Sequence, residues 1–277
     1  MNCKNCGTML HGKHCFHCGQ KVFRPEDKRL RHLVTEFFHH FTHLDGKYLA
    51  TLKRILFRPG KVTRDITEGI TVPHFKLSAM FVIGTIIYYV LPSQMVVSTP
   101  ANESFEKQIT QDEYRQWKLD FAEKKSITKN ISIAELGAKY DEKQHTYGKL
   151  LVLLFVPLLI PVLWILSKLI RKFNSQNTFT AYDLGVASLE VNSIILYGFY
   201  LVPGICIWLI TLIIPSEAVS MTGIIVFIVA ILFTLFSFFK RGYALRWWQA
   251  LVCLAILIVC YVYVMQLYGL ICFFTFI

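Results

Sequence analysis

The chain has 277 residues, of which 54% are hydrophobic and only 17% are charged. Soluble domains carry about 25% charged residues, so this composition excludes an ordinary soluble domain and favours a membrane protein. Lysine and arginine outnumber aspartate and glutamate by 29 to 18, which gives a net charge of +11. Such an excess is typical of nucleic-acid binding, of contact with anionic lipid, or of the basic loops that orient membrane proteins.

Four cysteines near the amino terminus predict a metal site in residues 1–22. Cys3, Cys6, Cys15 and Cys18 form two CxxC pairs that are separated by eight residues, a pattern typical of four thiolates around one tetrahedral zinc ion in a zinc-ribbon-like module. A closed set of four ligands indicates a structural zinc ion rather than a catalytic one. Two disulfides or a redox-active CxxC are the alternatives, and both are disfavoured by a reducing cytoplasm and by the lack of a thioredoxin-like pattern.

Residues 28–72 are predicted to form amphipathic helices next to the membrane. In 29–44 and again in 47–57, apolar residues recur at helical spacing and leave basic residues on the opposite face. Pro59 and Gly60 end the second helix. Lysine and arginine on such helices attract anionic lipid headgroups by about 1 kcal/mol each. Nucleic-acid binding is the weaker explanation of this charge, because the phenylalanines of the apolar face need burial.

A stripe of histidines on the first of these helices raises the possibility of a second metal site. His32, Glu36, His39 and His43 are spaced by four, three and four residues, so they share one face of a helix. Two imidazoles one turn apart can hold a metal ion together, and the carboxylate could join them. The alternative, which the sequence favours, is a solvated polar face near lipid headgroups.

Residues 77–277 are predicted to be a helical membrane domain. Five stretches approach the roughly 20 apolar residues that are needed to cross the hydrocarbon core, and they lie at 77–97, 150–167, 190–214, 221–239 and 247–270. The short loops at 168–186 and 240–246 are basic, as is the amino-terminal segment, so the positive-inside rule places all three in the cytoplasm. The predicted protein is thus a multi-pass protein of the inner membrane with a cytoplasmic amino terminus.

The segment 98–149 then lies on the other side of the membrane. It is long and charge-balanced, and Ser132 with Glu135 has the spacing of a capping box. Aromatic and aliphatic residues, among them Phe105 and Trp117, recur at roughly helical intervals. We expect a small external cap of helices.

Glu190 is the one ionisable residue that we expect within a predicted span, at the start of the third. Ionisable residues in spans are functional candidates because each costs about 2.5–3.5 kcal/mol at a helix centre. Pro157, Pro161 and Pro203 could open helices around a transport site. An interfacial position for Glu190 and ordinary proline kinks are the alternatives.

Three groups of residues carry a resemblance to a known family. They are Cys3 to Lys21 with its paired cysteines, Phe38 to Asp45 with the sequence FHHFTHLD, and Arg58-Pro59-Gly60-Lys61. Together they resemble the bacterial membrane family named domain of unknown function 3667. The resemblance covers about the first 65 residues and implies a zinc-ribbon membrane protein, with no activity attached.

The sequence thus predicts an all-α integral membrane protein of about five transmembrane helices with a small zinc module. No catalytic motif is apparent, which favours a non-enzymatic protein that recruits a cytoplasmic partner or senses lipid. A small transporter that uses Glu190 and a metal-dependent enzyme that uses the histidine stripe are the alternatives.

Overall fold

The computed structural model describes residues 2, 7–9, 12, 15–17, 46–71, 73–92, 95, 103–110, 114–175, 179–213 and 217–277. The chain divides into two compact units, Met1–Leu49 and Ala50–Ile277, each of which is described by itself. In the first unit, Asn2 and Met9 form an antiparallel bridge around Gly7, whose φ is 74°. Glycine adopts this positive φ without a steric penalty.

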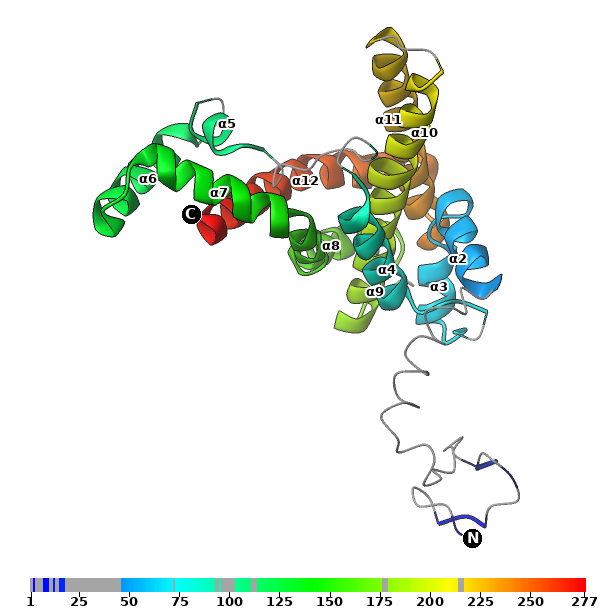
Figure 1. Ribbon diagram of the computed structural model, residues 1–277. Helices are drawn as coiled ribbons and strands as arrows, with labels where there is room; N and C mark the ends of the chain where they lie inside the picture. The colour runs from blue at the N-terminus through cyan, green and yellow to red at the C-terminus, as the bar shows by residue number, and fades with distance from the viewer. Residues whose placement is uncertain are drawn as a thin grey trace. The chain divides into compact units, whose positions relative to one another are not determined.

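Every secondary-structure element that the structure describes in the second unit is a helix (Figure 1). The elements, with η4 a 3₁₀ helix and η5 a π-helix, are α2 (Gly46–Phe57), α3 (Lys61–Thr67), α4 (Leu77–Val90), α5 (Phe105–Thr110), α6 (Arg115–Lys129), α7 (Ile133–Tyr147), η4 (Gly148–Leu154), α8 (Phe155–Phe173), α9 (Ala181–Ile195), η5 (Leu196–Leu201), α10 (Val202–Thr211), α11 (Glu217–Gly242) and α12 (Trp247–Phe276). The predicted all-helical class is therefore confirmed for this unit.

Four helical stretches are long and apolar enough to cross a membrane, and they run over Gly148–Phe173, Ala181–Ile210, Ile225–Gly242 and Trp247–Phe276. Large apolar side chains on them are exposed, among them Ile165, Val226 and Val259. Exposed apolar surface of this extent is unfavourable in water and is expected against lipid. These helices support a multi-pass membrane protein.

The first predicted span, 77–97, is shorter than expected. Its helix α4 has 14 residues and covers about 21 Å at 1.5 Å per residue, less than the roughly 30 Å of a hydrocarbon core. The helix ends because Pro92 disfavours helical geometry at the preceding residue, and Leu91 is extended, with ψ at 140°. The structure therefore has four helices of spanning length among its described residues, where the sequence predicted five.

The third predicted span begins earlier than residue 190. Thr180 and Asp183 form a reciprocal capping box that starts α9 at Ala181. The helix continues through η5 into α10, and the π-turn comes immediately before Pro203, whose missing N–H cannot join a regular ladder. Glu190 therefore lies about 14 Å along this helix from its start, and not at its end.

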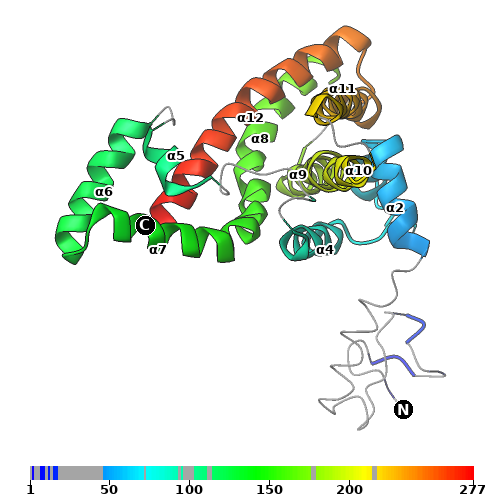
Figure 2. The same cartoon turned by 45° about the horizontal axis from the view of Figure 1, so that its top comes forward.

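The helices α8 and α12 run side by side, and together they cross the group formed by α9, α10 and α11 (Figure 2). The helices α11 and α12 touch near their connection and then diverge. Basic residues collect at the ends where α8 and α11 finish, and the Lys168 ammonium lies 3.5 Å from the ring centre of Trp164. Tryptophan and lysine together are typical of the membrane surface.

The segment that was expected to form an external cap is helical, as α5, α6 and α7, and it lies at the carboxyl end of α12. Ser132 accepts a hydrogen bond from the Glu135 N–H, which confirms the predicted helix start. Lys129 donates to the Ile277 carbonyl and Lys143 to the Phe276 carbonyl, both at 3.0 Å. The two ammonium groups thus satisfy carbonyls that the end of α12 leaves without partners.

Gly84 provides a test of the packing between α4 and η5. A Cβ at Gly84 would lie 2.6 Å from the Tyr197 hydroxyl, which donates to the Met80 carbonyl at 2.7 Å. We expect Gly84→Ala to displace this ring and to lower the free energy of unfolding by about 1–3 kcal/mol, measured by unfolding in detergent. Gly185→Ala is the matched control because its Cβ would meet nothing within 4 Å; equal stabilities of the two variants would contradict this packing.

Candidate functional site

The turn between α2 and α3 is the centre of the candidate site. The Arg58 N–H donates to the Arg54 carbonyl at 2.7 Å, which closes the last turn of α2. Pro59 follows and is buried. Gly60 then takes φ of 80° and ψ of −15° as the N-cap of α3, a left-handed conformation that costs other residues about 1–2 kcal/mol. The proline and glycine that were predicted to end the helix therefore do so.

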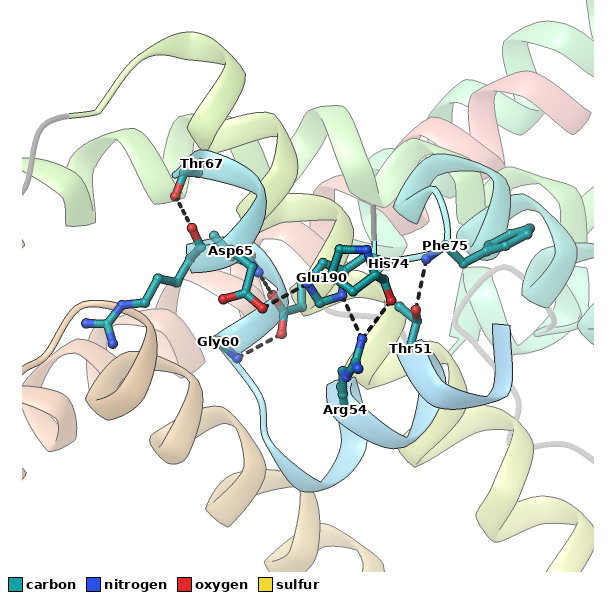
Figure 3. Close-up of polar contacts among 11 residues, drawn as sticks. Thr51, Arg54, Gly60, Asp65, Thr67, His74, Phe75 and Glu190 are labelled. Carbon is teal, nitrogen blue, oxygen red and sulfur yellow. Dashed lines mark hydrogen bonds and ion pairs between the residues drawn. The ribbon is translucent and has the colours of Figure 1, made fainter. Parts of the chain in front are cut away.

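Glu190 of α9 binds the main chain of this turn. Its side chain is fully buried, and its Oε1 accepts the Gly60 N–H at 2.8 Å while its Oε2 accepts the Thr63 N–H at 2.6 Å (Figure 3). The first N–H groups of a helix have no partner within the helix, and they carry partial positive charge. The carboxylate thus supplies the partners that water cannot supply in a buried place.

The backbone of the turn also touches the carboxyl end of α11. A Cβ at Gly60 would lie 2.5 Å from the Phe238 carbonyl oxygen and 2.7 Å from the Gly242 nitrogen. Only glycine fits such an approach. Nearby, Tyr243 is buried, and burial together with the neighbouring Glu190 and Asp183 carboxylates raises the pKa of its hydroxyl. This tyrosine therefore stays protonated and neutral.

A second set of polar contacts fixes the segment that follows α3 (Figure 3). Arg54 donates to the Pro73 carbonyl at 2.7 Å and lies 3.4 Å from Nδ1 of His74. Because a guanidinium can only donate, Nδ1 accepts, and the proton on Nε2 is donated to Asp65 at 2.8 Å. Thr51 accepts the Phe75 N–H at 2.9 Å. Helices α2 and α3, on either side of the turn, therefore both form hydrogen bonds with residues 73–75.

Basic side chains surround a hollow of about 560 Å³ on the outside of this turn, lined by Phe57, Arg58, Lys61, Arg64, Asp65 and Arg241. We call this hollow the basic pocket. Its four cations come from the turn, from α3 and from the end of α11. Arg241 donates to the Phe57 carbonyl at 3.2 Å, and the one acid is engaged by His74. Arg64 also forms an ion pair with Glu68 at 3.9 Å. The four cations outnumber these two carboxylates, so the pocket keeps a net positive charge that suits a phosphate or another anion.

The predicted metal ligands cannot be placed in the same way. Cys3, Cys6 and Cys18 of the zinc site lie outside the described residues, and Cys15 is buried. Among the residues that the structure does describe, no three histidine, cysteine, aspartate or glutamate side chains are placed to hold a metal ion. The zinc module of residues 1–22 stays a prediction.

The structure does not test the predicted second metal site either, because His32, Glu36, His39 and His43 lie outside the described residues. Glu190, the predicted transport candidate, is described by the structure, and both of its carboxylate oxygens accept hydrogen bonds from main-chain donors.

The basic pocket was not predicted from the sequence. Its signal was present in Arg58-Pro59-Gly60-Lys61, where two cations flank a turn that glycine makes tight.

Comparison of the chain with family models, with curated proteins and with solved structures finds no match. The resemblance of about the first 65 residues to a known family therefore stays a prediction.

Gly60 and Gly69 provide a matched test of the turn. Both have positive φ, 80° and 88°, but a Cβ at Gly69 would meet nothing within 4 Å. We expect Gly69→Ala to lower the free energy of unfolding by about 1–2 kcal/mol through backbone strain alone. Gly60→Ala should lower it by about 1–3 kcal/mol more, since the new Cβ also meets the end of α11. Unfolding in detergent measures both, and equal losses would contradict the close approach.

Proposed function

We propose that this protein is a non-enzymatic, multi-pass inner-membrane protein that senses anionic lipid at its cytoplasmic face. The observation that carries the proposal is the basic pocket, in which Arg58, Lys61, Arg64 and Arg241 converge on one hollow. The ligand is the phosphate group of an anionic lipid headgroup. Each lysine or arginine near an anionic surface contributes about 1 kcal/mol of attraction.

The position of the pocket supports this ligand. It adjoins the end of α11, where Lys240 and Arg241 follow the apolar part of the helix. Positively charged residues at the ends of spans favour the cytoplasmic side, where anionic lipids give the surface a negative potential. A phosphate at the level of the headgroups would therefore meet the pocket directly.

The attachment of the pocket to the membrane helices supports sensing rather than simple adhesion. Arg58 and Lys61 flank Gly60, and Gly60 is held by Glu190 of α9 and lies against Gly242 of α11. A headgroup that binds these two cations and shifts their side chains would also shift the backbone of the turn, which contacts α9 and α11. Lipid binding and the packing of the spans are thus linked through one short stretch of backbone, as linkage between two sites requires.

The amino-terminal cysteines give the proposal its second part. A zinc module in residues 1–22, which precedes the lipid-binding segment in the sequence, would present a compact surface to a cytoplasmic protein partner. The resemblance to domain of unknown function 3667 supports the same arrangement. Transport through Glu190 is the less favoured alternative, because both carboxylate oxygens accept main-chain hydrogen bonds and a transport carboxylate must exchange its partners.

Neutralising the pocket tests lipid binding. We expect Arg58→Gln with Lys61→Gln to weaken the binding of phosphatidylglycerol by about 30-fold, which corresponds to about 2 kcal/mol for two charges. Titration of the lipid into purified protein, followed by thermal stability, measures the change. The control is Lys172→Gln with Lys240→Gln, which removes two exposed charges that do not line the pocket. Equal weakening by both pairs would show that only the total charge matters and would contradict the proposal.

Metal analysis tests the zinc module. We expect one zinc ion per purified chain, and Cys3→Ser with Cys18→Ser should remove it because two of four thiolates are lost. His39→Ala with His43→Ala should leave the zinc content unchanged. Zinc that survives the cysteine variant would contradict the predicted ligands, and a second metal ion that is lost with the histidines would favour the alternative of a metal-dependent enzyme.

A further inference from the structure

A second hollow, independent of the basic pocket, lies between the membrane helices. It has a volume of about 800 Å³, within the usual range for ligand sites. Three apolar walls are formed by η5 with Phe199, by α11 with Leu232 and by α12 with Leu257. We call it the membrane cavity. Its lining residues on α11 and α12 lie beyond the point where the two helices connect.

The local structure explains why the space is not filled. The π-turn of η5 widens the helix between Ile195 and Val202, and π-turns are frequent at functional sites. Gly198 lets this turn approach α11 closely, with a Cβ position only 3.2 Å from Ile231. Helices η5 and α11 therefore lie close together at Gly198.

The length of the cavity fits one lipid leaflet. Its residues on α12 extend from Leu257 to Gly269, which is about 18 Å at 1.5 Å per residue. Half of a hydrocarbon core of about 30 Å is about 15 Å. An acyl chain that runs from the headgroup level to the middle of the membrane would therefore match the cavity along its length.

The end of the cavity near the helical cap is polar. Glu103, Gln108 and Tyr114 line it, and Glu103 is the one charged residue among these lining residues. The buried Lys118 ammonium lies behind the lining, where it donates to the Gln108 side chain. A carboxylate at the headgroup level attracts a cation and repels an anionic headgroup. Deeper in the cavity, the buried Tyr261 hydroxyl interacts with that of Tyr200, and no other hydrogen-bond partner for it is found among the described residues. An oxygen acceptor in the ligand would satisfy it.

We propose that the membrane cavity binds one phospholipid with an ammonium headgroup, such as phosphatidylethanolamine. One acyl chain lies between α11, α12 and η5, and the ammonium group lies beside Glu103. An ester carbonyl of the lipid accepts the hydrogen bond that the Tyr261 hydroxyl offers. This site takes a headgroup of the opposite charge preference to that of the basic pocket, and it lies in the leaflet next to the cap.

Native mass spectrometry after exchange into equal mixtures of phosphatidylethanolamine and phosphatidylglycerol tests the site. We expect the wild-type chain to retain one phosphatidylethanolamine, and Leu232→Trp to reduce this retention at least tenfold by filling the cavity. The matched control is Val229→Trp, which adds the same ring to the exposed face of α11, outside the cavity. Equal retention by the two tryptophan variants would overturn the proposal.

Two further variants separate the parts of the site without large changes of volume. Glu103→Gln removes the charge from an exposed position and should abolish the preference for phosphatidylethanolamine, with lipid still bound. Tyr261→Phe should lower retention severalfold for both lipids. A wild-type preference for phosphatidylglycerol, or a retained lipid without an amine, would overturn the headgroup assignment. Arg58→Gln with Lys61→Gln should leave this retention unchanged, so failure at one site is distinguished from failure at the other.

Discussion

The contact between the Glu190 carboxylate and the start of α3 is the constraint on which the candidate site depends. A carboxylate within a membrane helix costs several kcal/mol, and it is tolerated here because two main-chain N–H groups replace the water that it loses. Those donors are themselves unpaired at the start of a helix. Each partner therefore removes the other's penalty, and loss of either would leave a buried group unsatisfied.

The same contact explains the residues around it. Gly60 needs positive φ to aim its N–H at the carboxylate, and it also needs a bare α-carbon to fit against Gly242. Arg58 and Lys61 then point away from the buried side, because the turn between them faces α9. The anchored turn thus brings Arg58 and Lys61 to the basic pocket, where Arg64 of α3 and Arg241 of α11 complete its charge.

The sequence predicted what depends on neighbouring residues. The helical class, the Ser132 cap and the stop at Pro59-Gly60 all follow from local patterns, and the structure confirms them. The sequence-based prediction was wrong on the length of the first span, because Pro92 ends the helix early. It was also wrong on the start of the third span, because the capping box of Thr180 and Asp183 begins the helix before its apolar part. Hydropathy detects apolar residues, whereas caps and prolines decide where the helix begins and ends.

The partners of Glu190 could not be predicted, because the hydrogen bond joins residues that are 130 positions apart. Glu190 stood out as an ionisable residue, but nothing near it in the sequence specifies a main-chain donor. The membrane cavity was hidden for a similar reason. It arises from the divergence of two helices and from a π-turn, and neither has a pattern in apolar periodicity alone.

The separation of Gly60 from Glu190 also sets an order for biosynthesis. A ribosome that adds about 5–20 residues per second needs roughly 6.5–26 seconds to advance the 130 positions from Gly60 to Glu190. Throughout this interval the N–H groups of Gly60 and Thr63 have no Glu190 carboxylate to bind. The anchored turn is therefore a late product of assembly, which follows the insertion of α9 and becomes complete only when the end of α11 reaches it.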